Sequence, residues 1–288
     1  MNQLITKEPS LHVLLIDGGN CNHRLLSASV LRIPLNADNL LLARHQGEIV
    51  VAVDHGQNLL TVGSLQILQD LALNKNPATI LVTGGGISSA SDTHLGLFDI
   101  PFITSIPDFT YLNPTCKEEY LKMLDFCVNV NKEGPIAIRI PSKGLISTGI
   151  EDTTDYSIKN KFKIINKGNK VAFIGLGSMF KLASETYEEL KKDKKIEGTL
   201  INPIFASGLD KELLEELKKE HDIVVCMEDG SLEGGFGHRI AAFYADSKIK
   251  VLLYGALKEF INCVPMKELN NRYRLKKELI IEDIMKQI

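Results

Sequence analysis

The chain has 288 residues, of which 44% are hydrophobic and 24% are charged, and its formal net charge is -3. This composition is typical of a globular protein with a well-buried core and excludes fibrous and disordered classes. The length fits two domains of about 100–150 residues each. Because the charge balance leaves no basic excess, nucleic acid is not expected as a partner.

No feature of the sequence predicts export or membrane insertion. The opening stretch, MNQLITKEPS, lacks the apolar core of a signal peptide, and no run approaches the roughly 18 apolar residues of a membrane span. The five cysteines are scattered and form no CxxC pair, which is typical of reduced thiols. We therefore expect a cytoplasmic protein.

Short apolar runs alternate with helical stretches in the first half of the chain. Near-continuous Val, Ile and Leu is what a sheet covered on both faces requires. The runs predict strands over 12–17, 48–54, 78–83, 109–114 and 135–141. Helical periodicity runs over 59–75 and 116–132, and Thr115 is the predicted N-cap of the second helix because acidic residues follow it in the first turn.

A polar, charge-rich stretch over about 145–168 predicts a connection between domains, and a second alternating series follows it. This series predicts strands over 171–177, 197–203, 222–228 and 249–255, and helices over about 179–192, over about 210–220, from Gly234 and over 276–288. Strand–helix alternation implies parallel βαβ units. The predicted fold is therefore α/β, with two domains that each contain a mostly parallel sheet flanked by helices.

Two glycine-bearing segments lie in the second half. IGLGSM (174–179) follows a strand and opens a helix, where a phosphate can bind the helix-terminal N–H groups. It lacks the third glycine of a dinucleotide fingerprint, so a tight turn is the simpler interpretation. MEDGSLEGGFG (227–237) has four glycines, more than an ordinary turn needs, which leaves a site or interface and a long turn both open.

Arg139 and His94 each follow or end a predicted strand of the first half. Ligands of open α/β sheets bind outside the carboxyl ends of the strands, where Arg139 in RIPSKG is placed to bind a phosphate or carboxylate. A surface arginine at the sheet edge is the alternative. His94, in SDTHLGLFDIP, follows the strand at 78–83 and shares that rim, although a lone histidine is more commonly structural. Together they predict a shared site.

Several segments resemble the C-terminal half of the 1-deoxy-D-xylulose-5-phosphate synthase family, within the transketolase superfamily. They are THLGLFDIPFITSIPDFTYLNPTCKEEYLKMLDF, GPIAIRIPSKG, EDGSLEGGFGHRI, LINPIFASGLDKELLEEL and LKKELIIEDIMKQI. The likeness is strong over about 92–288 and weak over 1–91. It implies a diverged pyrimidine-binding domain over 1–145, a linker over 146–168 and a transketolase C-terminal domain over 169–288. The family's diphosphate signature is absent, so a separate chain is expected to hold the diphosphate and Mg²⁺ of thiamine diphosphate.

The resemblance also implies roles for three residues. The family's TH histidine binds substrate and moves protons in the active site, which implies this catalytic role for His94. The arginine of the last strand of the middle domain binds the substrate phosphate, which implies that role for Arg139. The family's cofactor-binding glutamate has Asp38 in LNADN as its nearest equivalent, and no metal ligand is predicted in this chain. Family positions for a tyrosine, an arginine and an acid are replaced near Asp54–His55, at Thr83–Gly84 and at Ala90, with Asp92 beside the last.

Two hypotheses follow from the resemblance. In the first, the chain is the small half of a split thiamine-diphosphate enzyme that transfers a two-carbon unit to an aldehyde, as from pyruvate to a glyceraldehyde phosphate, in a homo- or hetero-oligomer with a diphosphate-binding chain. In the second, it is a pseudoenzyme or regulatory subunit that keeps the fold and the dimerisation domain. The retained His94 and Arg139 favour the first, and the replaced residues favour the second. A free-standing NAD-type enzyme fits least.

Overall fold

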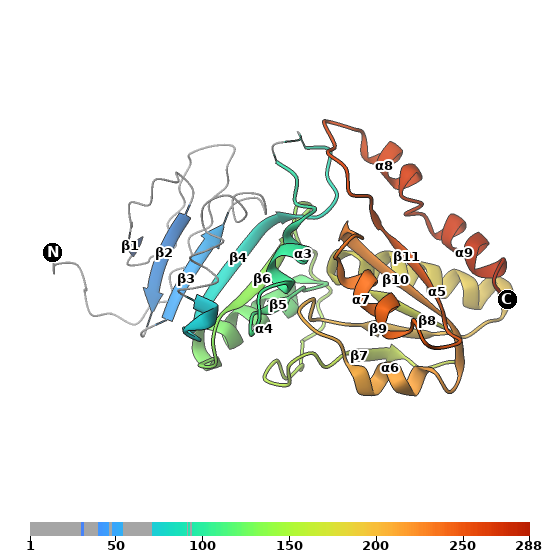
Figure 1. Ribbon diagram of the computed structural model, residues 1–288, viewed down its shortest axis with the longest axis horizontal. Coiled ribbons are helices and arrows are strands. Elements are labelled where there is room, and N and C mark those ends of the chain that lie inside the picture. The colour runs from blue at the N-terminus through green and yellow to red at the C-terminus, as the bar shows by residue number, and fades with distance from the viewer. Residues whose placement is uncertain (1–29, 32–39, 46–47, 54–70, 91, 93) are drawn as a thin grey trace.

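The computed structural model describes residues 30–31, 40–45, 48–53, 71–90, 92 and 94–288, and Figure 1 shows two sheets side by side. Asp38, the predicted strand at 12–17 and most of the predicted helix at 59–75 lie outside the described residues. Both sheets are dominated by parallel pairs, and the predicted α/β fold with mostly parallel sheets is confirmed.

The first sheet has the strand order β1-β2-β3-β4-β6-β5. Its strands are β1 (Val30–Leu31), β2 (Leu40–His45), β3 (Glu48–Val53), β4 (Ala78–Gly85), β5 (Thr110–Leu112) and β6 (Ile136–Pro141). β3, β4, β6 and β5 run parallel, whereas β1 and β2 add antiparallel pairs at one edge. The predicted strands at 48–54, 78–83, 109–114 and 135–141 are confirmed, and the register places Arg139 beside Val82.

Two α-helices of the first unit bear on the site and on the sequence prediction. They are α3 (Asp99–Thr104) and α4 (Lys117–Asp125), which continues as a π-helical turn over Phe126–Val130. The prediction of Thr115 as the N-cap of α4 is wrong, because Cys116 holds that position. Thr115 instead donates its N–H and hydroxyl to the carboxylate of Glu119, at 2.8 and 3.0 Å. The side chain of Glu119, inside α4, thus accepts hydrogen bonds from Thr115, which lies before the helix.

The second sheet has the strand order β11-β10-β8-β9-β7. Its strands are β7 (Lys163–Asn166), β8 (Lys170–Gly175), β9 (Thr199–Asn202), β10 (His221–Ser231) and β11 (Lys250–Ala256). β7 lies in the stretch predicted to be a plain connection, which is a correction. It is an antiparallel edge strand whose Ile164 and Ile165 are 42% and 43% exposed. Because the strand is only partly buried, its sequence carries only a weak apolar pattern.

The helices of the second unit flank this sheet. They are a 3₁₀ turn (Gly177–Met179), α5 (Phe180–Lys194), α6 (Lys211–Leu217), α7 (Phe236–Phe243), α8 (Met266–Arg272) and α9 (Lys277–Met285). Asp210 caps α6 by accepting the Leu213 N–H at 3.1 Å. Figure 1 shows α8 and α9 on the side of the second sheet away from the first sheet. Within the part of the chain that the structure describes, no helix has both the length and the apolar character to cross a bilayer.

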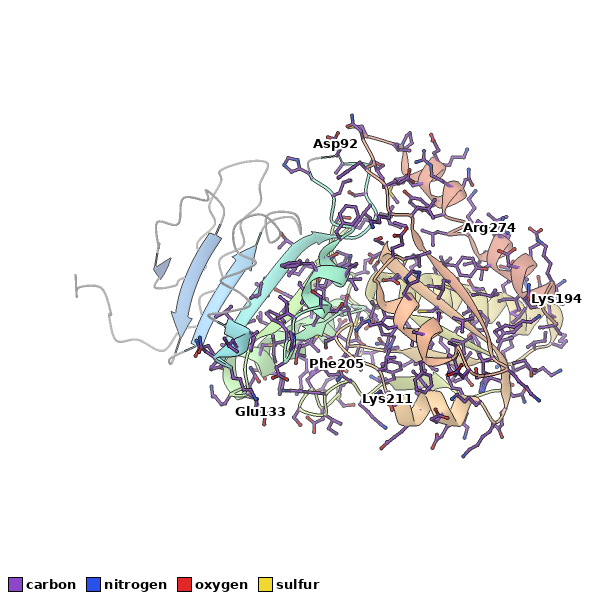
Figure 2. All side chains as sticks on the ribbon, viewed as in Figure 1. Asp92, Glu133, Lys194, Phe205, Lys211 and Arg274 are labelled. Atoms are coloured by element: carbon purple, nitrogen blue, oxygen red, sulfur yellow. The ribbon has the colours of Figure 1, made fainter. Side chains whose placement is uncertain are left out.

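The two units, each built on one of the sheets, pack against each other at an interface that we call the seam, and they share one hydrophobic cluster. Residues of both sheets, among them Val82 and Ile174, belong to the same buried cluster. Leu112 forms a bridge to Phe205, which Figure 2 labels at the seam, and the Ala206 N–H donates to the Tyr111 carbonyl at 2.8 Å. Because packing is continuous across the seam, the two units hold each other in place. The boundaries predicted at 145/146 and 168/169 stay a prediction.

Candidate functional site

Arg139 is buried at the seam, where carboxylates of both units surround its guanidinium. Its side chain is 3% exposed. Nε and Nη2 donate to Asp99 at the start of α3, at 2.6 and 3.2 Å, as a two-pronged pair. Nη1 donates to Asp229 near the end of β10, and Nη2 also donates to the Gly96 carbonyl at 3.3 Å. Among the described residues, these bonds occupy four of the five N–H donors of Arg139.

Two hydroxyl groups complete this cluster. Tyr111 of β5 donates its hydroxyl to Asp99 at 2.5 Å, and Ser178 donates to Asp229. Burial and the neighbouring Asp99 raise the pKa of Tyr111 well above its usual value, which keeps it a donor. Burial disfavours the charged form of Arg139, but Asp229 and Asp99 outweigh this and hold its pKa well above the ordinary value. We call Asp99, Arg139 and Asp229, with Tyr111 and Ser178, the seam cluster.

The glycines at and just after the end of β4, Gly85 and Gly86, leave room for the seam cluster. A Cβ on Gly85 would lie 2.8 Å from Nε of Arg139, and one on Gly86 would lie well under 3.0 Å from the Asp229 carboxylate. Gly86 also has a φ of +103°, which favours glycine. Its N–H donates to the Gly96 carbonyl at 2.7 Å, which ties this turn to the loop after it. Close packing around the cluster therefore explains why residues 85 and 86 are glycines.

The structure places His94 on an exposed part of the same loop. The next residues, Leu95, Gly96 and Leu97, are buried, and Gly96 is the point at which the loop meets Arg139. Figure 2 shows the neighbouring Asp92 on a loop beside a segment of the second unit, where the Cys263 N–H donates to the Ala90 carbonyl at 3.0 Å. His94 and Arg139 thus come from the same rim, but one is exposed and the other is enclosed by carboxylates. Their predicted roles stay predictions.

The described residues do not by themselves fit thiamine diphosphate with Mg²⁺. No group of three His, Cys, Asp or Glu side chains among them is placed to hold a metal ion. A cleft of about 1060 Å³ lies over α5 and Lys277, and another of about 710 Å³ lies between Lys75 and Ser207, so neither is at the rim of His94 and Arg139. Asp38, the predicted cofactor carboxylate, lies outside the described residues.

Glu228 organises the glycine-rich segment after β10. It is 0% exposed and accepts the N–H groups of Phe236 and Gly237 at the start of α7, at 3.0 and 2.7 Å. A Cβ on Gly235 would lie 2.6 Å from the Glu228 carboxylate, so glycine is needed for this capping. On the seam side, a Cβ on Gly230 would lie 3.1 Å from Ile100 of α3. The segment therefore serves helix capping and packing between the units.

The pH dependence of stability should carry the signature of Glu228. Burial raises its pKa to about 7 against the lowering effect of the two N–H groups. A raised folded-state pKa stabilises the fold below about pH 4.5, and this contribution is lost as the pH rises through about 7. We expect Glu228→Gln to flatten the fall in unfolding free energy over pH 4.5–7, by at most about 3 kcal/mol. Urea denaturation at several pH values measures this, and an unchanged slope would contradict it.

The IGLGSM turn likewise packs against the first unit. Gly177 has a φ of +53°, and a Cβ there would lie 3.3 Å from the Cβ of Asn113. Ser178, the next residue, donates to Asp229. The tight turn predicted from the sequence is present, and its polar group is bonded within the protein. Sequence analysis did not identify Asp99, Tyr111, Ser178 or Asp229 as partners of Arg139, although it singled out the segments that hold Ser178 and Asp229.

Comparison with known proteins shows what this chain is similar to. The family model "Transketolase, C-terminal domain" matches residues 160–280. The 1-deoxy-D-xylulose-5-phosphate synthase of Clostridium tetani is 31% identical over 77% of this chain and 35% of its own length. The enzymes of the same name from Lachnoclostridium phytofermentans and Fusobacterium nucleatum are each 32% identical, over 77% and 76% of this chain and 36% of their own lengths. The chain thus spans about a third of the length of these relatives.

Solved structures agree on the fold. A structure described as "Split gene transketolase, inactive beta4 tetramer" superposes with a TM-score of 0.67 at 19% identity, over 82% of this chain and 75% of that one. The transketolase of Campylobacter jejuni superposes with a TM-score of 0.61 at 18% identity, over 82% of this chain and 35% of that one. Residues 160–280 therefore match the transketolase C-terminal domain, and the chain is similar in sequence to the C-terminal portion of 1-deoxy-D-xylulose-5-phosphate synthase and in fold to transketolase.

Proposed function

We propose that this chain is the smaller subunit of a two-chain transketolase-superfamily enzyme of the 1-deoxy-D-xylulose-5-phosphate synthase type. The enzyme would transfer a two-carbon unit to an aldehyde, as from pyruvate to a glyceraldehyde phosphate. A separate diphosphate-binding chain would hold most of the thiamine diphosphate and Mg²⁺, and the reaction would take place where the chains meet in a homo- or hetero-oligomer.

The observation that carries this proposal is the likeness of the chain to two kinds of protein. Its sequence is 31% identical to the Clostridium tetani synthase over 77% of the chain, and its fold superposes on a structure described as a split-gene transketolase with a TM-score of 0.67. The first likeness supports a reaction of the synthase type, and the second supports a subunit that works with a second chain. Fold likeness alone does not fix activity, so the activity needs a direct test.

A non-catalytic subunit is the second candidate, and the seam cluster favours it. A phosphate-binding arginine needs free N–H donors, yet Arg139 is 2% exposed and is paired with two carboxylates. A substrate phosphate would have to displace Asp229 or Asp99 to gain a two-pronged contact. Arg139 as a phosphate ligand is therefore the part of the proposal that the geometry supports least, and exposed His94 is the part that remains accessible.

Native mass spectrometry of the tagged chain, purified gently from its own host, tests the proposal. We expect a complex with a second chain and bound thiamine diphosphate, and this complex should convert pyruvate and glyceraldehyde phosphate with release of carbon dioxide. A homo-oligomer without cofactor, and without turnover when candidate diphosphate-binding chains are added, would contradict the proposal and favour the non-catalytic subunit.

His94→Ala should lower kcat/KM of that complex by about 100-fold, as expected for loss of a group that moves protons in the transition state. The side chain is exposed, so the variant should fold and keep its partner. Lys248→Ala, at an exposed position in the turn before β11, is the control and should keep full activity. Equal activity of the two variants in the assay would remove His94 from the proposed site.

A further inference from the structure

We infer that Asp229 of the second unit, acting through Arg139, positions the loop that carries His94. Asp229 would be a positioning residue, with no contact to substrate. The inference concerns the attachment of residues 94–97 to both units, and its link to catalysis rests on the proposed function.

The loop is held by hydrogen bonds to both units within three residues of His94. The Gly96 carbonyl accepts the Gly86 N–H at 2.7 Å and Nη2 of Arg139 at 3.3 Å, both from the first unit. The Leu97 carbonyl accepts the Ser231 N–H at 2.8 Å, from the end of β10. Three hydrogen bonds at Gly96 and Leu97 therefore fix where the loop that carries His94 lies in the structure.

Asp229 fixes the orientation of the Arg139 guanidinium, which makes one of these bonds. Asp99 accepts Nε and Nη2, whereas Asp229 accepts Nη1, so the two carboxylates grip the planar group from different sides. Asp229 is itself oriented by the Ser178 hydroxyl. It also lies in the same strand as Ser231, two residues away, so the end of β10 reaches the loop by two routes. Loss of Asp229 should loosen both of them.

A variant without Asp229 is expected to fold. Asp229→Ala leaves Arg139 paired with Asp99 alone, one positive and one negative charge, so no buried charge is left without a partner. Asp229→Asn keeps an acceptor oxygen of the same shape and should restore part of the effect. Asp222, an exposed residue at the other end of β10, supplies the matched control Asp222→Ala.

Hydrogen exchange of the full chain, resolved by peptide mass spectrometry, tests the inference. The amides of Gly86 and Ser231 donate to the loop, so they report on its attachment. We expect their exchange to be at least tenfold faster in Asp229→Ala, less so in Asp229→Asn, and unchanged in Asp222→Ala. The amides of Asn113 and Ala206 bond across the seam away from the loop, to Ile204 and Tyr111, and should stay within twofold of the wild type.

Two outcomes would overturn the inference. One is unchanged exchange at Gly86 and Ser231. The other is equal acceleration at Asn113 and Ala206, which would mean that Asp229 supports the whole seam. In the reconstituted complex, Asp229→Ala should lower kcat about tenfold, with partial rescue by Asp229→Asn. If exchange responds as expected but the wild type shows no turnover with any partner, the positioning role stands and the proposed function fails.

Discussion

Replacing Arg139 with alanine is expected to lower the free energy of unfolding by about 3–5 kcal/mol, the usual cost of removing one partner from a buried ion pair. Asp99 and Asp229 would both remain buried, at 0% and 6% exposure, without the cation that neutralises them. Their hydroxyl donors, Tyr111 and Ser178, cannot replace that charge. Urea denaturation followed by circular dichroism measures the loss.

Arg272→Ala is the matched control for Arg139→Ala, because Arg272 also pairs with two carboxylates. Its Nη1 lies 3.1 Å from Glu259 and its Nη2 lies 2.9 Å from Glu268, but all three side chains are about a third exposed or more. Exposed pairs contribute about 0–1 kcal/mol, so this variant should be nearly as stable as the wild type. Similar losses for the two variants would mean that the seam cluster contributes no more than a surface pair.

The same comparison bears on the function of Arg139. An arginine kept for substrate phosphate would cost little stability when removed, because its charge would be unpaired without substrate. A large loss of stability therefore favours the structural role, and a small loss with a large rise in KM favours the phosphate contact. Arg139→Lys separates these further, because lysine keeps the charge but cannot make the two-pronged pair with Asp99.

Much of the fold could be predicted because short stretches of the sequence carry the pattern of the element that they form. The buried strands β4 and β6 are near-continuous apolar runs, which is the pattern expected of strands covered on both faces. The sequence does not reveal the edge strand β7, because its only two large apolar side chains, Ile164 and Ile165, are 42% and 43% exposed and lysines flank it. The predicted N-cap of α4, Thr115, is one residue away from the observed one. Helix ends depend on local hydrogen bonds such as the one from Thr115 to Glu119, and composition does not specify them.

The site was less predictable, because its bonds join residues that are far apart in sequence. The sequence identifies Arg139 as a polar residue on a strand of the first sheet, but the two carboxylates that pair with it lie 40 and 90 residues away. An aspartate such as Asp99 gives the same local signal whether it caps a helix, faces solvent or pairs with an arginine. Only the packing of α3 and β10 against β6 distinguishes these cases. The glycines around them were the available sign of close approach.

Gly96→Ala should lower the free energy of unfolding by about 3 kcal/mol or more, the upper range for forcing extra atoms into a packed interior. A Cβ on Gly96 would lie well under 3.0 Å from the carbonyl oxygen of Gly84, a backbone atom that cannot rotate away. Either the Gly86–Gly96 bridge opens or β4 shifts at its end, and both displace the carbonyl that Arg139 binds. Thermal denaturation and hydrogen exchange at Gly86 would report the two effects together.

Gly149→Ala separates this steric cost from the general cost of the substitution. Gly149 has a φ of +70°, and a Cβ there would have no heavy atom within 4 Å, so alanine meets only backbone strain. That strain costs about 1–2 kcal/mol. Gly96 lacks a positive φ, so a larger loss at Gly96 than at Gly149 can only come from close approach. If Gly149→Ala proved the more damaging, the close approach of Gly96 to the backbone of β4 would not be a main source of stability.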